Sequence, residues 1–155
     1  MTDTGDNTLI LETTKGKVSI AMRPDLAPGH VARIKALVRE GFYDGIVFHR
    51  VIDGFMAQTG CPQGTGTGGS GKKLKAEFNR EPHRRGTVSM ARSNDPDSGD
   101  SQFFICFDDA SFLDGKYTVW GQVTEGMENV DKIKRGEPVQ NPDKIVTARI
   151  AEDAA

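Results

Sequence analysis

Long apolar runs, a basic leader and cysteine are what this sequence has least of. Its 155 residues include two cysteines, Cys61 and Cys106, which share no motif spacing, so we expect two buried free thiols rather than a disulfide. No apolar run reaches the roughly 20 residues that a membrane-spanning helix needs. The start of the chain lacks the basic and apolar segments of a signal peptide. These absences predict a cytoplasmic protein without a membrane segment.

The chain also has almost no excess of one sign of charge. With the histidines neutral the net charge is −2, which gives no electrostatic footprint for nucleic acid or anionic lipid. An apolar fraction of 36%, with eight phenylalanines, is too high for a disordered chain. We expect a disordered or frayed segment over residues 1–7 and a single domain over residues 8–152. No heptad repeat indicates self-association, so a monomer is the default.

Glycine, by contrast, is abundant, and its 18 residues indicate many turns between short strands. Lys15-Gly16 joins two runs of alternating polarity, 9–14 and 17–23, as a hairpin turn does. Six more strand-like runs follow along the chain, at residues 46–52, 55–59, 87–92, 102–107, 117–123 and 144–151.

Two segments have helical periodicity. Over residues 28–40 the apolar side chains recur at helical spacing, with Pro28 in the first turn and Gly41 placed for a C-terminal cap. A second, shorter helix is marked by Met127, Val130 and Ile133. Two helices cannot cover both faces of an open sheet of eight strands. The sequence therefore predicts a mostly-β fold, a closed eight-stranded antiparallel β-barrel capped by two α-helices.

Several familiar motifs fail when their context is considered. Gly64, Gly66 and Gly69 have the spacing of a dinucleotide-binding loop, but no helix start follows them. The same loop begins like a phosphate-binding P-loop, yet Lys73 stands where a magnesium-binding Ser or Thr is required. Two groups of potential ligands lack metal-binding spacing, namely His30, His49 and His83, and Asp95, Asp97 and Asp100. We expect neither a cofactor nor a metal.

One group of residues remains a candidate functional site, in the two strand-like runs 46–52 and 55–59. The first run carries a cation, and alternation places Phe48, Arg50 and Ile52 on one face. No obvious nucleophile lies near that arginine. The group therefore suits a reaction that needs placement and a hydrogen bond, without a covalent intermediate.

The turn between the two runs decides which side chain faces Arg50. A two-residue loop would pair Arg50 with Ala57. A three-residue loop pairs Arg50 with Gln58 and Ile52 with Met56, which gathers a cation, an amide and apolar side chains on one face. We adopt the three-residue register.

Each of these residues could also have a purely structural role. Arg50 could serve only to pair with a carboxylate, although no acidic residue alternates onto its face nearby. Gln102 shares a face with Phe104 and is expected to bring a second amide to the group. The apolar members could be plain core, as most such residues of a barrel are, namely Phe55, Phe104, Phe112 and Leu113.

Five segments together resemble the cyclophilins, a family of peptidyl-prolyl cis-trans isomerases. They are FHRVIDGFMAQTG, the GTGTGG loop, GTVSMARS, SQFFICF and FLDGKYTVWGQV, and they occur in the family's order. The resemblance runs from about residue 9 to residue 150, and the short loops are those of a compact bacterial member. It implies an enzyme that rotates Xaa-Pro bonds and assists protein folding, with its site on the outer face of the barrel.

The resemblance also implies roles, motif by motif. Arg50 would be the catalytic arginine, and Gln58 would orient it. A pocket for the proline ring would be formed by Phe55, Met56, Phe104 and Leu113. The groove that holds the peptide would be lined by Ala91, Arg92 and Gln102, with Gly66 and Thr67 on its far side.

Two further substrate-binding positions depart from the pattern of many eukaryotic members. Phe112 and Tyr117 stand where those members have Trp and His. Because the indole N–H is missing at Phe112, we expect only weak cyclosporin binding. The expected partners are proline-containing peptides and unfolded or folding proteins, with no nucleic acid and no membrane.

Two other classes of function fit some of the same features. A proline-binding adaptor would use the groove without accelerating isomerisation, and a protease-coupled assay on an Ala-Pro peptide separates the two. A barrel that binds small apolar ligands internally predicts an open interior, whereas the bulky strand residues here indicate a filled one.

Overall fold

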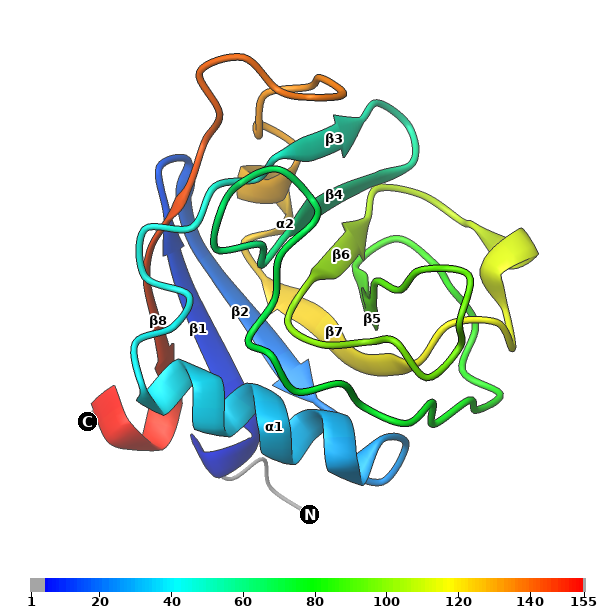
Figure 1. Cartoon of the computed structure of the whole chain (residues 1–155). Helices are drawn as coiled ribbons and strands as arrows, with labels where there is room; N and C mark the ends of the chain where they lie inside the picture. The colour runs from blue at the N-terminus through cyan, green and yellow to red at the C-terminus, as the bar shows by residue number, and fades with distance from the viewer. Residues whose placement is uncertain (1–4, 155) are drawn as a thin grey trace.

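The computed structural model describes residues 5–154, in which eight strands form one antiparallel sheet accompanied by two α-helices (Figure 1). The expected frayed segment 1–7 lies partly outside the described residues, and its last three residues form a short 3-10 helix, η1. In chain order the elements are η1 (Gly5–Asn7), β1 (Thr8–Thr13), β2 (Gly16–Met22), α1 (Pro28–Arg39), β3 (Arg50–Ile52), β4 (Met56–Thr59), β5 (Thr87–Met90), β6 (Phe103–Cys106), η2 (Ser111–Leu113), β7 (Val119–Glu125), α2 (Met127–Val130), β8 (Ile145–Ile150) and η3 (Ala151–Ala154).

The sheet is a curled half-barrel, with strand order β3-β4-β6-β5-β7-β2-β1-β8 (Figure 1). The expected closed barrel is wrong, because the edge strands β3 and β8 do not pair with each other within the described residues. The two edges approach at an isolated bridge between Val47 and Lys144. Residues 48 and 49 are not part of a strand, so β3 retains only three residues, which is too short to close a ladder with β8.

The same break in the strand separates Phe48 from Arg50. The prediction that these two side chains share a face is wrong, because Phe48 is wholly buried in the main core while Arg50 reaches the outer surface. Regular alternation holds only inside β3, where Val51 points into the main core and Ile52 packs on the opposite side.

The sheet separates two hydrophobic clusters of unequal size. The larger one fills the interior of the half-barrel and includes the only tryptophan, Trp120, together with the buried face of α1. The smaller one lies on the outer face, because β4 and β6 send alternate side chains to opposite sides. It consists of Met56, Phe104, Cys106, Ala110 and Leu113. This outer cluster is the floor of the candidate site.

The β3–β4 hairpin has the predicted three-residue turn. Arg50 pairs with Gln58 and Ile52 pairs with Met56, as the adopted register requires. Gly54 has a φ of 74° in this turn, a conformation that glycine adopts without strain. The turn therefore places the arginine and the amide side by side on the outer face.

Helix α1 begins at Pro28 as predicted and ends at Arg39, one residue before the predicted end, and it crosses one end of the curled sheet (Figure 1). Pro28 occupies the first helical position. Gly41 has a φ of 77° just beyond the helix, and its N–H donates to the Val38 carbonyl over 3.0 Å. The shorter helix α2 ends at Val130, one turn before Ile133, which is nevertheless buried in the main core.

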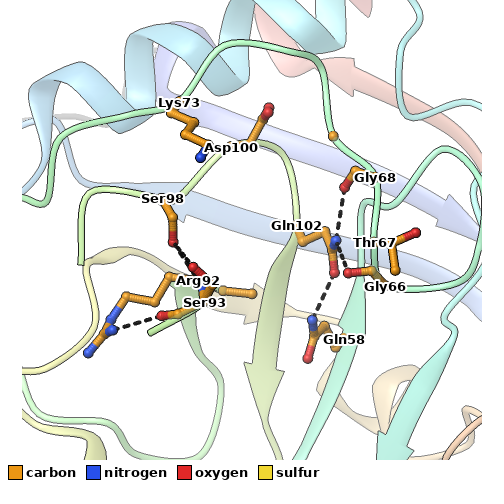
Figure 2. Close-up of a pocket in the computed structure, with 12 residues that line it drawn as sticks. Gln58, Gly66, Thr67, Gly68, Lys73, Arg92, Ser93, Ser98, Asp100 and Gln102 are labelled. Atoms are coloured by element: carbon orange, nitrogen blue, oxygen red, sulfur yellow. Dashed lines mark hydrogen bonds between the residues drawn. The ribbon is translucent and has the colours of Figure 1, made fainter. Parts of the chain in front are cut away.

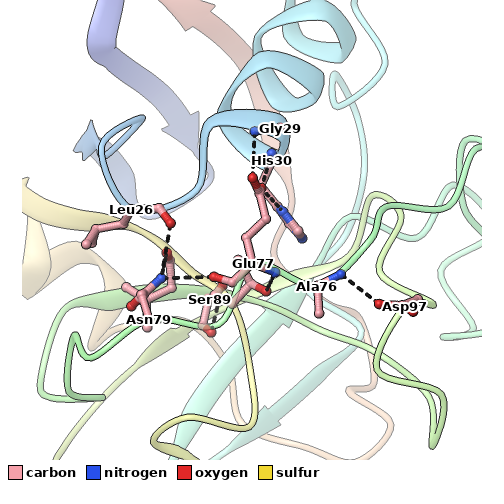
Figure 3. Close-up of polar contacts among 10 residues, drawn as sticks. Leu26, Gly29, His30, Ala76, Glu77, Asn79, Ser89 and Asp97 are labelled. Atoms are coloured by element: carbon pink, nitrogen blue, oxygen red, sulfur yellow. Dashed lines mark hydrogen bonds and ion pairs between the residues drawn. The ribbon is translucent and has the colours of Figure 1, made fainter.

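The N-terminus of α1 is capped from a distant part of the chain (Figure 3). The residue before the helix, Ala27, has no side chain that could accept a hydrogen bond, so the first-turn N–H groups need another partner. The Glu77 carboxylate accepts the N–H groups of Gly29 and His30 over 3.0 and 2.8 Å. It also contacts His30 Nδ1 at 2.6 Å. The irregular segment around Glu77 thereby fixes the helix to the rest of the fold.

Among the described residues, no helix is long and apolar enough to cross a membrane.

Candidate active site

A small cavity of about 110 Å³ opens on the outer face of the sheet, above the outer cluster. Its floor is apolar and its rim is polar. The floor and walls come from Phe55, Met56, Phe104, Leu113 and Tyr117, and the rim from Arg50, Gln58, Ala91 and Arg92. A cavity with cationic side chains at the edge of an apolar floor can hold a small apolar ring beside a hydrogen-bond donor.

Arg50 is held at the rim by two different partners. Its side chain is 41% exposed. Nη1 donates to Gln58 Oε1 over 3.3 Å, and Nε donates to Glu137 Oε2 over 2.7 Å. The sequence offered no carboxylate on the arginine's face; the structure supplies one from a loop 87 residues further along the chain. Nη2 has no hydrogen-bond partner among the residues that the structure describes.

A chain of two amides connects Arg50 to a loop across the groove, and Figure 2 shows the part of this chain from Gln58 to the loop. Gln58 Nε2 donates to Gln102 Oε1 over 2.9 Å. Gln102 Nε2 donates in turn to the backbone carbonyls of Gly66 and Gly68, each over 2.9 Å. Because each amide nitrogen in this chain donates to an acceptor, the orientation of both amides is defined. Gln58 consequently presents its oxygen, rather than its nitrogen, to the arginine.

The loop that carries Gly66 and Gly68 is itself held in place by Cys61. The N–H groups of these two glycines donate to Cys61 Sγ, each over 3.3 Å. Burial opposes ionisation of that thiol, but the backbone N–H groups directed at it prevail and lower the pKa of Cys61 to about 7. Both cysteines are free and buried, which confirms the sequence prediction. The sulfur thus acts as an internal acceptor that shapes the loop.

A second cavity, of about 330 Å³, adjoins the first (Figure 2). The two share Gln58, Ala91 and Arg92. The second is lined mainly by polar groups and glycine backbone, with further contributions from Gly66, Thr67, Gly68, Gly69, Lys73, Ser93, Ser98, Asp100 and Gln102. Together the cavities form a groove with an apolar end and a polar end.

The wall between the cavities is stiffened by Arg92 and Tyr117. The Arg92 guanidinium lies over the Tyr117 ring, 4.7 Å from its centroid. Arg92 Nε also donates to the Lys116 carbonyl over 2.8 Å. The Tyr117 ring meets Phe104 edge to face, with centroids 5.7 Å apart. These contacts therefore hold Arg92 at the rim and Tyr117 in the wall of the cavity.

His83 supports the pocket from behind. Its ring stacks on Phe104 with centroids 6.1 Å apart, and it hydrogen-bonds Asp114 through Nδ1 and Ser89 through Nε2 over 3.0 and 2.9 Å. Burial lowers the pKa of His83 more than the neighbouring carboxylate raises it. The backbone N–H of His83 holds the pKa of Asp114 below its ordinary value. His83 thus ties Phe104 to the chain that follows η2.

The structure brings together all but one of the residues expected at the site. Twelve of them line one or both cavities. The exception is Phe112, which is 63% exposed and lies beside the pocket, with its ring centroid 5.5 Å from that of Phe55. The sequence reasoning did not anticipate Glu137, Lys73 or Asp100. Glu137 carries no local signal, because it reaches Arg50 only through the packing of a loop.

No group of three or more potential ligands from His, Cys, Asp and Glu is placed to hold a metal ion within residues 5–154.

Comparisons with known proteins show which family the chain resembles. Residues 8–152 match the family model described as "Cyclophilin type peptidyl-prolyl cis-trans isomerase/CLD". A probable peptidyl-prolyl cis-trans isomerase of Brucella suis is 55% identical over 165 residues, covering 96% of this chain and 84% of the relative. Peptidyl-prolyl cis-trans isomerase B of Bacillus subtilis is 46% identical over 123 residues, covering 78% and 85%.

Solved structures are similar over the same length. The crystal structure of cyclophilin AquaCyp293 from Hirschia baltica superposes with a TM-score of 0.91 at 36% identity, covering 98% of this chain and 76% of that one. A cyclophilin-type isomerase from Cryptosporidium parvum, crystallised in the presence of the dipeptide Ala-Pro, gives a TM-score of 0.86 at 27% identity, covering 92% and 98%.

Proposed function

The chain belongs to the cyclophilin-type peptidyl-prolyl cis-trans isomerases, and from that premise we propose that it speeds rotation about Xaa-Pro bonds by directing the Arg50 guanidinium at the prolyl nitrogen. The apolar cavity beside Arg50 receives the proline ring. No covalent bond is made or broken, so the protein acts by placement and by one charge-assisted hydrogen bond.

The chemistry of the bond explains why a single donor suffices. Delocalisation of the nitrogen lone pair keeps the peptide planar, and the rotation barrier is about 18–20 kcal/mol. Xaa-Pro isomers are nearly balanced in energy, yet they exchange only in tens to hundreds of seconds. In the twisted state the lone pair is localised on nitrogen, which then accepts a hydrogen bond better than in either planar form. A donor fixed near that nitrogen therefore stabilises the transition state selectively.

The observation that carries this proposal is the position of Arg50. The guanidinium lines the rim of the apolar cavity. Gln58 and Glu137 engage Nη1 and Nε, while Nη2 has no partner among the described residues. An arginine whose N–H groups all donated to a carboxylate would have no donor left for the substrate. Here an N–H edge stays available beside a space that fits a small ring.

The apolar floor has two roles in the proposal. Phe55, Met56, Phe104 and Leu113 hold the ring while the preceding carbonyl swings, which converts binding into orientation. They also exclude water that would compete for the Arg50 donor. Met56 and Phe104 belong to the outer cluster and are almost fully buried, so the floor does not have to form on binding.

The expected reductions of the rotation barrier are consistent with separate contributions from Arg50 and from the apolar floor. A millionfold acceleration requires the barrier to fall by about 8 kcal/mol. A preorganised donor at a developing lone pair contributes about 3–4 kcal/mol. Orientation of the ring and exclusion of water supply the remainder.

We propose proline-containing peptides and unfolded or folding chains as substrates. The Cryptosporidium relative was crystallised in the presence of Ala-Pro, a dipeptide that carries the ring proposed for the apolar cavity here. The residues before the proline would follow the groove into the polar cavity. Phe112 lies beside the pocket without an indole N–H, which supports the expectation of weak cyclosporin binding.

A protease-coupled assay on an Ala-Pro peptide tests the mechanism. The wild-type protein should accelerate cis-to-trans exchange, and the Arg50→Ala variant should bind the same peptide while accelerating it far less. An adaptor would bind the peptide and leave its exchange rate unchanged. Equal catalysis by both proteins would remove Arg50 from the mechanism.

A further inference from the structure

The loop that carries Glu137 is joined to the free edge of β3 by backbone hydrogen bonds. Val51 N–H donates to the Gly136 carbonyl and Gly136 N–H donates to the Val51 carbonyl, each over 2.8 Å. Val139 N–H donates to the His49 carbonyl over 3.1 Å. The loop therefore occupies the side of β3 that β4 does not, and Arg50 lies between the two.

The loop is tight as well as anchored. A Cβ added at Gly136 would lie 2.8 Å from both the Pro138 carbonyl oxygen and Val139 Cα, closer than real contacts allow. Only glycine fits there without a shift of the backbone. The next residue, Glu137, is consequently presented to β3 from a defined position.

Glu137 and Gln58 accept hydrogen bonds from the Arg50 guanidinium on two sides. Glu137 Oε2 lies 2.7 Å from Nε on the loop side, and Gln58 Oε1 lies 3.3 Å from Nη1 on the β4 side. A guanidinium is planar, so two partners at different nitrogens fix both its position and its plane. Gln58 alone would leave the side chain free to turn about that single contact. The carboxylate removes this freedom and leaves Nη2 uncommitted.

We propose that Glu137 is a positioning residue for the isomerase reaction, holding Arg50 in the orientation that serves the prolyl nitrogen. This inference rests on the proposed function of Arg50. The Glu137 side chain is 58% exposed, and pairs of this kind contribute little to folding stability. The role of the pair is therefore to orient the donor, and the short charge-assisted hydrogen bond suits that role.

The test measures kcat and KM for Glu137→Ala, Glu137→Gln and a matched control. Glu137→Ala should lower kcat/KM by about 10-fold, mainly through kcat, because a displaced donor weakens the transition state more than the bound ground state. Glu137→Gln keeps an oxygen that accepts from Nε and should retain most of the activity. The control is Asp153→Ala, since Asp153 pairs with Arg39 Nε over 2.9 Å at similar exposure but far from the groove. It should leave kcat and KM unchanged.

A double-mutant comparison separates this role from a structural one. If Glu137 acts through Arg50, the Arg50→Ala/Glu137→Ala double variant should be no slower than Arg50→Ala alone. A further 10-fold loss in the double variant would overturn the positioning role, and so would a Glu137→Gln protein as slow as Glu137→Ala.

The outcomes also distinguish the two proposals. A slow Arg50→Ala protein with a fast Glu137→Ala protein overturns the role of Glu137 and leaves the mechanism intact. A fast Arg50→Ala protein overturns the mechanism, and the role of Glu137 falls with it.

An NMR signal for the Arg50 Nε–H should be slow to exchange in the wild type and fast in Glu137→Ala.

Discussion

Gln58 Nε2 donates a hydrogen bond to Gln102 Oε1 over 2.9 Å, and this contact joins the arginine's strand pair to the loop across the groove. Neither amide could turn over without breaking a second hydrogen bond, since Gln102 also donates to Gly66 and Gly68. The position of Arg50 therefore depends on backbone carbonyls that it never touches.

Replacing Gln102 with Ala should slow the enzyme. Gln58 would lose its acceptor and could present either end of its amide to Arg50, so we expect kcat/KM to fall by about 10-fold. Gln102→Glu is the matched variant, because its carboxylate still accepts from Gln58 but cannot donate to Gly66 and Gly68. It should also be slow. Wild-type rates in both variants, measured by the protease-coupled assay, would show that the amide chain has no part in catalysis.

Arg50→Ala should lower kcat/KM by about 10²–10³, the loss expected for one preorganised donor. Arg50→Lys keeps the charge but lacks the planar fork, so it cannot serve Gln58, Glu137 and substrate together, and we expect it to be similarly slow. The unfolding free energy should change by less than about 1 kcal/mol, because the side chain is half exposed. Chemical denaturation of both variants checks that activity, rather than folding, has been lost.

Phe104→Ala should affect both binding and stability. The ring is buried against His83 and Tyr117, so its removal leaves a hole beneath the pocket and should reduce the unfolding free energy by about 3–5 kcal/mol. Peptide KM should rise, because the proline ring loses its floor. Phe104→Leu refills part of the hole and should recover part of both losses. A Phe104→Ala protein with unchanged stability would contradict the packing described here.

Stability should decline in mild acid. Burial lowers the pKa values of His30, His49 and His83 in the folded protein. Below about pH 6.5 the unfolded chain therefore binds more protons than the folded one, and the unfolding free energy falls as the pH drops. Five carboxyls have lowered pKa values and add a further loss below about pH 5, namely Asp6, Asp25, Glu77, Asp114 and Asp131.

Urea denaturation at about pH 7.5 and about pH 5.5 measures the histidine contribution. His49→Leu is the informative variant, since both ring nitrogens of His49 are buried without a partner among the described residues. It should lose less stability between the two pH values than the wild type does. An equal loss in both proteins would exclude His49 from the effect.

The central pairing of the site could be predicted from sequence because it depends on local rules. Alternation and the length of one turn were enough to place Gln58 opposite Arg50 and Met56 opposite Ile52. The helix ends at Pro28 and Gly41 were predictable for the same reason, since a fixed φ and a positive φ are local properties.

The features that were missed depend on distant packing. Glu137 reaches Arg50 because its loop pairs with Val51, and nothing near residue 137 in the sequence indicates this. Barrel closure was inferred from counting strands, but it depends on the length of β3, which the break at Phe48 shortens. Alternation cannot reveal such a break, because it assumes that the strand continues.

The cap on α1 has a consequence for how the protein emerges from the ribosome. Glu77 supplies the acceptors for Gly29 and His30, and it follows them by 48 and 47 residues (Figure 3). During synthesis residues 28–39 therefore emerge well before the carboxylate that caps them. The first turn of α1 can be capped only once the segment around Glu77 has been made and has docked.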